Sequence, residues 1–380
     1  MSLSVDERDE LRSSARALLS REAASDRVRA SRSGTPGFDR ALWDRMVELG
    51  WTSIHVPPEL GGAGAGYAEL AVVLHELGRA LVGSPFLASA VLATSALTLS
   101  DNTPLATELL AGLVNGRSLG SVAFASVEGS YELQRSSVEW GHAGESIRLR
   151  GSTGFVLDAD VADFLVLAAL DQSGCPVVVA VDRATSGLRI ERVATVDTTT
   201  RLFTVAFDDV VVADDRMLCA PGLSAQELFD RVVAVGVVAT ACDATGVTER
   251  ALERAADYAK ERVQFGKPIG SFQAVKHHCA NIAIAVQASR AAVRGAADAL
   301  DADPGDWSKT ASVTSSYVGP ACAEACALAL RVYGGIGFTW EHESHLYLKR
   351  VKLDELLFGT PSWHRRRLAS ALIASVNERG

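Results

Sequence analysis

The sequence predicts an α+β fold in which a small middle β-domain lies between an N-terminal helical domain and a C-terminal four-helix bundle. Apolar residues recur at helical spacing toward both ends of the chain. Short β-prone runs separated by turns fill the middle, without the alternation of strands and helices that is typical of a parallel sheet. We therefore expect domains at residues 1–117, 118–216 and 217–380.

The N-terminal region shows helical periodicity from Val5 to about Gly116, interrupted by glycine and proline clusters at Gly34–Gly37 and Pro57–Gly66. Within the second cluster, Gly61–Gly66 has the look of a dinucleotide-binding loop. Such a loop follows a strand and has the spacing GxGxxG. Here Pro57-Pro58-Glu59 comes first and the glycine spacing differs, so we expect a flexible turn.

The remaining elements are predicted from local patterns. Five β-prone runs occupy the middle: Val122–Ala125, Ile147–Arg150, Phe164–Ala168, Pro176–Val181 and Leu202–Phe207. Long helical stretches follow at Glu227–Glu261, Phe272–Leu300 and Trp307–Tyr333, with a turn at Asp301–Asp306 and a final helical segment from about His345.

Composition excludes several classes of protein. A formal charge of −9 argues against nucleic-acid binding, which needs a basic surface. The six cysteines show no zinc or CxxC spacing, so we predict no metal site and no disulfide, in keeping with a reducing cytoplasm. The acidic segment Met1–Arg12 is not a signal peptide, and no uninterrupted apolar run reaches the ~18 residues of a membrane span.

The stretch around Phe265 is the most informative. A helix is predicted to end at Arg262, and a second helix to begin after Gly266, Pro268 and Gly270 with Ser271 as its N-cap. An arginine beside free backbone N–H groups suits a pyrophosphate. A stiff αα-hairpin without a ligand is the alternative interpretation.

Residues 262–277, RVQFGKPIGSFQAVKH, closely resemble the flavin-binding hairpin of acyl-CoA dehydrogenases. The resemblance extends over most of the chain and in the expected order. Its other motifs are Gly50-Trp51, Glu59-Leu60-Gly61-Gly62, Glu76-Leu77-Gly78-Arg79, Phe207–Val212 and Tyr333–Thr339.

This resemblance implies FAD as cofactor, an acyl-CoA as substrate and an electron-transfer flavoprotein as acceptor, in a homo- or hetero-oligomer of lipid, steroid or fatty-acid catabolism. It also implies that the hairpin contacts the FAD of a neighbouring subunit. Arg262, Phe265 and Gln273 would grip the pyrophosphate and adenosine. Gly334, Gly335 and Gly337 would let the backbone approach the same cofactor, the alternative being a plain turn.

The sequence departs from the family at the catalytic base. In many members a glutamate near the C-terminus takes the α-proton, and here Phe358 stands in its place. A second known location, on the first long helix of the bundle, corresponds to Gly236. Asp243, two turns further along that helix among apolar residues, is the remaining candidate base. The alternative is that Asp243 caps or bends the helix.

The β-domain departs as well. The family's flavin-lining Trp-Ile-Thr corresponds to Phe155-Val156-Leu157, and its glycine-rich loop to Ala125–Ser130. Phe155 either stacks near the flavin or is a core residue, and Leu157 offers no hydroxyl group. Two hypotheses follow: a catalytic acyl-CoA dehydrogenase with Asp243 as base, or a non-catalytic subunit that completes the FAD site of an α2β2 enzyme whose partner supplies the base.

Overall fold

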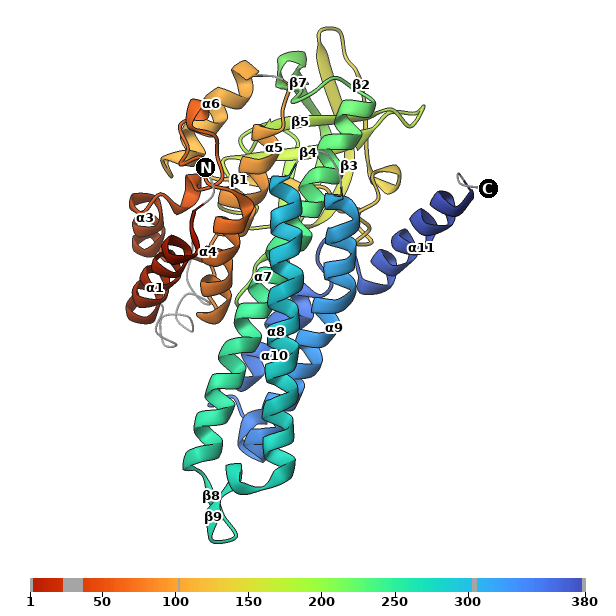
Figure 1. The fold of residues 1–380 in the computed structure, drawn as a ribbon. Helices are drawn as coiled ribbons and strands as arrows, with labels where there is room; N and C mark the ends of the chain where they lie inside the picture. The colour runs from red at the N-terminus through yellow and green to blue at the C-terminus, as the bar shows by residue number, and fades with distance from the viewer. Residues whose placement is uncertain (1–2, 23–36, 102, 303–305, 378–380) are drawn as a thin grey trace.

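The computed structural model describes residues 3–22, 37–101, 103–302 and 306–377, and it has the predicted α+β fold. N-terminal helices flank a strand-rich region, and three long helices run away from that region to a small hairpin at their far end (Figure 1). The predicted turns at Gly34–Gly37 and Asp301–Asp306 fall mainly outside the described residues.

The N-terminal helices form a layer against the bundle. They are α1 (Val5–Glu22), α3 (Arg40–Glu48), α4 (Tyr67–Arg79), the π-helix η3 (Phe86–Ala93), α5 (Thr94–Thr98) and α6 (Thr103–Val114). Asp39 begins α3 by accepting a hydrogen bond from the Leu42 amide at 3.1 Å. The Gly61–Gly66 segment is a loop before α4, preceded by a 3₁₀ turn at Pro58–Leu60.

A curled seven-stranded sheet follows. Its strands are β1 (Gly120–Ala123), β2 (Val138–His142), β3 (Ser146–Leu157), β4 (Phe164–Leu170), β5 (Pro176–Asp182), β6 (Leu188–Val193) and β7 (Leu202–Ala213). Alternate residues of β4 enter different cores: Val166 packs toward the helices, whereas Leu165 and Leu167 join a second core within the sheet domain. This burial on both faces explains why β4 is an apolar run without polar alternation.

The sequence patterns missed β2 and β6. In β6, Arg189 and Glu191 face solvent, and within the described part of the chain this strand pairs with β7 alone. As an edge strand it lacks an apolar run. In β2, Gly141 interrupts a run of only five residues. The strand propensity of both segments is low, and pairing with their long neighbours compensates for it.

The bundle consists of α7 (Leu223–Glu261), α8 (Gln273–Asp301), α9 (Trp307–Tyr333) and α10 (Ser344–Asp354), and α11 (Pro361–Asn377) projects from it. Two stretches, Leu223–Glu261 and Trp307–Phe338, are long and apolar enough to cross a membrane, but 94% of the apolar window of the first is buried inside the protein. Threonines in α7 satisfy their hydroxyls within the helix, as Thr245 does at the Ala241 carbonyl (2.7 Å). α7 is therefore a dry core helix.

Two glycines allow α4 to approach α7 closely. A Cβ atom at Gly246 of α7 would collide with the backbone carbonyl of His75, and one at Gly78 of α4 with the backbone of Asp243. Backbone atoms cannot move aside as a flexible side chain can, so these positions fix the distance between the N-terminal layer and the bundle.

We predict that Gly246→Ala lowers the free energy of unfolding by about 1–3 kcal/mol, because the added methyl group overpacks this contact. Gly295→Ala is the matched control, since Gly295 also lies within a helix but a Cβ atom added to it would have no neighbour within 4 Å. We expect that change to stabilise the protein by roughly 0.5–1 kcal/mol through helix propensity. Chemical denaturation measures both, and equal effects at the two sites would contradict the packing argument.

Candidate functional site

The predicted FAD-binding hairpin is an exposed two-stranded turn at the far end of the bundle (Figure 1). β8 (Val263–Gln264) pairs with β9 (Lys267–Pro268), and the two turn residues between them, Phe265 and Gly266, have φ values of 55° and 76°. Positive φ at both central positions is the requirement of a tight hairpin turn. The Phe265 ring is 90% exposed, an unusual position for a large apolar side chain.

Of the side chains expected to meet FAD, the Phe265 ring packs edge-on against Phe272, with ring centroids 6.0 Å apart. Within the described part of the chain, the exposed Arg262 guanidinium and Gln273 amide form no hydrogen bond or ion pair with other residues. Ser271 is not the predicted N-cap of α8, because the helix begins at Gln273 after a 3₁₀ turn at Ile269–Ser271. The hairpin rigidly presents a cation, an amide and an aromatic ring toward something outside this chain.

The glycine turn lies at the same end of the bundle. Tyr258 of α7 and Tyr333 of α9 pack with ring centroids 4.9 Å apart, which holds the start of η7 (Gly334–Phe338) beside the hairpin. Gly334 and Gly335 are exposed with open space around them. Gly337 differs, because it is buried and a Cβ there would lie 3.0 Å from the Leu330 carbonyl.

These residues fit the pyrophosphate and aromatic groups of FAD. An unpaired guanidinium suits a phosphate, an exposed ring suits stacking, and two open glycines allow close approach of a ligand. For Gly337, the structure provides an internal packing reason instead. The cofactor-binding roles of Arg262, Phe265, Gln273 and the three glycines remain predictions.

The two positions where a base is expected lie against each other. The ring of Phe358 covers Gly236 so closely that a Cβ on Gly236 would lie 2.5 Å from it. Tyr131 packs on the same ring with a centroid distance of 5.1 Å. Earlier on α7, Phe229 stacks on Phe124 with a centroid distance of 4.8 Å. Aromatic rings therefore fill the region beside α7.

His364 fixes the backbone of Phe358. Its Nε2 lies 3.2 Å from the Phe358 carbonyl and its Nδ1 lies 3.2 Å from the Ser312 hydroxyl. The neutral imidazole satisfies both contacts when Nε2–H donates to the carbonyl and Nδ1 accepts from the hydroxyl. Burial lowers the pKa of His364 to about 4, so the ring is neutral at pH 7.

Phe155 lies at an irregular point of β3. The register with β7 shifts between Thr153 and Val156, and Phe155 has a φ of 55°. Its ring is 37% exposed and packs beside Gly129 of the Ala125–Ser130 loop. Leu157, in contrast, is buried in the main core. Phe155 is thus not a plain core residue, and its contact with a flavin remains a prediction.

The prediction that Asp243 has only apolar surroundings is wrong. Arg350 of α10 donates to both of its carboxylate oxygens, from Nε at 2.8 Å and from Nη2 at 2.9 Å. The Asp243 residue is only 5% exposed. Both oxygens of this carboxylate are engaged as the counterion of a buried guanidinium, so this geometry favours a structural role.

Arg350 joins three parts of the chain. Besides Asp243 on α7, its Nη1 donates to the hydroxyls of Thr199 (3.2 Å) and Thr200 (2.6 Å) in the loop before β7. Asp354 lies 3.8 Å from its Nε, and burial together with the Asp243 charge raises the pKa of Asp354 well above its usual value. Asp197, also buried, lies 4.0 Å from Nη1, so three carboxyl groups surround this one guanidinium, and a protonated Asp354 removes one of their charges.

Sequence reasoning missed Arg350, Tyr131 and His364. Nothing in their local patterns marks them, because their partners lie far away along the chain. One signal was present for Arg350: an aspartate within a long apolar helix requires a buried cation or a proton.

We predict that Asp243→Asn lowers the free energy of unfolding by about 1.5–3 kcal/mol, because Arg350 loses its bidentate counterion and keeps only the more distant Asp354 and Asp197. Asp257→Asn on the same helix is the control, since Asp257 pairs with Lys260 at the surface and its loss costs about 0–1 kcal/mol. Chemical denaturation distinguishes the two. A negligible cost at Asp243 would contradict its structural role.

We also predict that acid destabilises the protein partly through His364. Its folded pKa of about 4 lies below the unfolded value near 6.5, so the unfolded state binds a proton first as the pH falls. The contribution of His364 to the free energy of unfolding is therefore complete above pH 6.5 and is lost as the pH falls to about 4. The full pKa shift corresponds to a loss of roughly 3 kcal/mol. His364→Gln should flatten the unfolding free energy between these pH values, and exposed His142→Gln should not. An unchanged slope in His364→Gln would contradict this assignment.

Comparisons with known proteins agree with the fold and the motifs. Residues 5–116 match the model of the acyl-CoA dehydrogenase N-terminal domain, and residues 229–373 match that of the acyl-CoA dehydrogenase C-terminal domain. The chain is 33% identical to acyl-CoA dehydrogenase IpdE2 of Mycobacterium tuberculosis, over 96% of this chain and 97% of that protein.

Two solved structures superpose over 98% of the chain with a TM-score of 0.87 and 27% identity. One is a steroid acyl-CoA dehydrogenase variant described as Tcur3481-Tcur3483, covered over 99% of its chain, and the other is the ChsE4-ChsE5 complex of Mycobacterium tuberculosis, covered over 98%. The chain therefore belongs to the acyl-CoA dehydrogenase family, whose members are FAD-binding oxidoreductases acting on acyl-CoA.

Proposed function

We propose that this chain is one subunit of a heteromeric acyl-CoA dehydrogenase, in which it completes the FAD site and a partner subunit supplies the catalytic base. One observation carries the proposal: Phe358 and Gly236 occupy both base positions and pack against each other. Neither position holds a carboxylate, and a side chain at Gly236 would collide with the Phe358 ring.

The length of α7 supports sharing of the cofactor site between subunits. Gly236 and Arg262 are 26 residues apart along this helix and its cap, which corresponds to roughly 40 Å at 1.5 Å per residue. A single flavin cannot contact the base positions and the hairpin of one chain at once. The hairpin is therefore available to FAD in an associated subunit, for which its exposed Phe265 and unpaired Arg262 are suited.

In this proposal the chain contributes binding and positioning. When bound, FAD supplies the acceptor for the hydride that leaves the acyl chain. Arg262 would neutralise pyrophosphate charge, and Gln273 and Phe265 would fix the adenosine half. The Phe358 amide contacts the Tyr131 hydroxyl, whose pKa burial raises. A thioester oxygen would have to displace that hydroxyl before the amide of Phe358 held it, as the family does with the amide of its base residue.

The second candidate is a dehydrogenase that acts alone with Asp243 as base. Its motivation is the burial of this carboxylate on α7, near Gly236. The two hydrogen bonds from Arg350 weaken it, because they hold both carboxylate oxygens in a buried ion pair. In both candidates the substrate is an acyl-CoA of lipid or steroid catabolism. The electron acceptor is an electron-transfer flavoprotein, and the reaction takes place in the cytoplasm.

Co-expression tests the proposal. We expect the chain to retain FAD when it is purified with a base-bearing relative, and to lose it when it is purified alone. In the complex, Arg262→Gln should weaken FAD binding by roughly tenfold or more, because a hydrogen bond to a charged group contributes about 1.5–3 kcal/mol. Lys260→Gln is the matched control: this neighbouring cation is also exposed but pairs with Asp257 of its own helix.

A different result would favour the second candidate. The chain purified alone would carry FAD that an acyl-CoA bleaches, and Asp243→Asn would abolish the bleaching while FAD binding and folding persisted. Equal FAD affinity in Arg262→Gln and Lys260→Gln would contradict the role of the hairpin in either assembly.

A further inference from the structure

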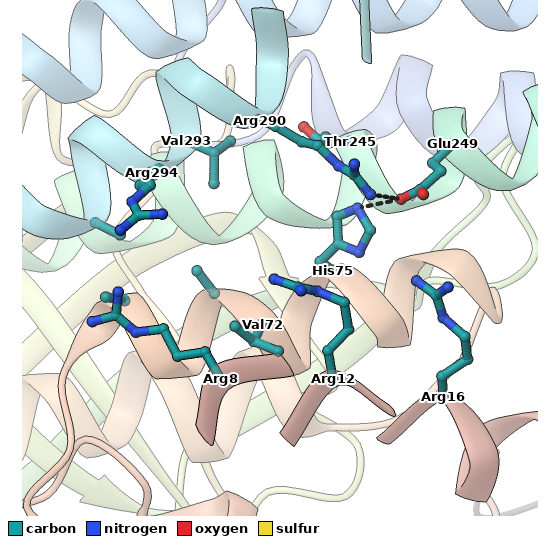
Figure 2. Close-up of a pocket in the computed structure, with 13 residues that line it drawn as sticks. Arg8, Arg12, Arg16, Val72, His75, Thr245, Glu249, Arg290, Val293 and Arg294 are labelled. Atoms are coloured by element: carbon teal, nitrogen blue, oxygen red, sulfur yellow. Dashed lines mark hydrogen bonds and ion pairs between the residues drawn. The ribbon is translucent and has the colours of Figure 1, made fainter. Parts of the chain in front are cut away.

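A groove with a cavity volume of about 390 Å³ lies between the N-terminal layer and the bundle. It is formed by α1, α4, α7 and α8, on a different part of the molecule from the hairpin and from Phe358. Figure 2 shows Arg8, Arg12 and Arg16 side by side along α1, facing Arg290 and Arg294 of α8. Its volume falls in the range of small-molecule sites.

The floor of the groove is aliphatic. Small side chains cover it from both sides: Ala68, Ala71, Val72, Val293 and Ala297. Among the described residues that line the groove, the only aromatic ring is that of His75. The stems of the arginines add further apolar surface along the walls. Such a floor accepts an aliphatic chain and offers no ring on which a nucleotide base stacks.

Three of the five arginines are committed to carboxylates of the fold. Arg16 donates through two nitrogens to buried Glu76, at 2.9 and 2.7 Å. Arg8 donates to buried Glu69 at 2.8 Å. Arg290 donates to Glu249 at 2.6 Å. These pairs hold the walls in place.

Arg12 and Arg294 are held more loosely. Arg12 pairs with Asp9 of its own helix, and both side chains are substantially exposed. Arg294 lies 3.9 Å from Asp298, also at the surface. Exposed pairs of this kind contribute little to stability, so an arriving anion displaces them at little cost. These two guanidinium groups lie on opposite walls of the groove.

The one acid in the lining does not repel an anion strongly. Burial alone would raise the pKa of Glu249, but His75, Arg290 and Arg79 outweigh it and lower that pKa to about 2. The His75 Nε2 lies 2.9 Å from the Glu249 carboxylate. The ionised Glu249 is thus neutralised at one end of the groove, where Figure 2 shows it beside His75.

We propose that this groove is a binding site for an aliphatic carboxylate, with the apolar chain on the floor around Ala71 and Val72 and the carboxylate recruited by Arg12 and Arg294. The site lies within one chain, so it does not depend on how the FAD site is shared. The positive rim attracts a carboxylate and the aliphatic floor attracts an apolar chain, so the groove selects a ligand that has both groups.

Isothermal titration calorimetry on the assembled flavoprotein tests the proposal with three probes: octanoate, octanol and acetate. We expect octanoate to bind saturably, and octanol and acetate to bind at least tenfold more weakly, since one lacks the charge and the other the chain. The double variant Arg12→Gln/Arg294→Gln should weaken octanoate binding by at least tenfold. Ala71→Leu, which fills the floor, should weaken it similarly.

The double variant Arg45→Gln/Arg148→Gln is the matched control. It removes two exposed, ion-paired arginines elsewhere and changes the net charge equally. We expect octanoate to bind it like the unaltered protein. The proposal is overturned if octanoate does not bind, if both double variants weaken it equally, or if it binds undiminished in Arg12→Gln/Arg294→Gln and Ala71→Leu, as it would at the acyl site. Thermal unfolding of each variant confirms that the fold is retained.

Discussion

The buried guanidinium of Arg350 is the interaction on which the arrangement of the molecule depends. It connects α10 to α7 through Asp243 and to the strand region through Thr199 and Thr200. Burial by itself would lower the pKa of Arg350, and the surrounding carboxylates raise it instead, so the group remains charged. Because an unpaired buried charge is costly, the three segments are held in one relative position. The position of Phe358, four residues beyond Asp354, follows from this arrangement.

α7 extends this constraint along the molecule. Its central part meets α4 at Gly246, the C-terminal segment at Gly236 and the arginine cluster at Asp243. Its far end carries the exposed hairpin. Because the central part of α7 is packed on several sides, the position of this helix is fixed. The same packing therefore sets the position of Arg262 and Phe265 at its far end. The dry core of α7 and the function proposed for its exposed end are therefore linked.

The sequence predicted the fold class because helical periodicity and turn residues act locally. Trp307–Tyr333 is a helix with the predicted limits, and the apolar runs of β4 and β5 were recognised. The environment of Asp243 was not predictable in this way, because its partner Arg350 is 107 residues away along the chain. The sequence shows that a counter-charge is required but does not say which arginine provides it.

The same limit applies to the two positions where the family's base is expected. In the sequence, Gly236 and Phe358 are two separate departures from the family pattern, whereas in the structure the Phe358 ring occupies the space that a side chain at Gly236 would need. Tyr131 packs on the ring from the sheet side, and His364 of α11 holds the backbone. A side chain at Gly236 would require the Phe358 ring to move, so the two departures from the family pattern are coupled through packing and are not independent.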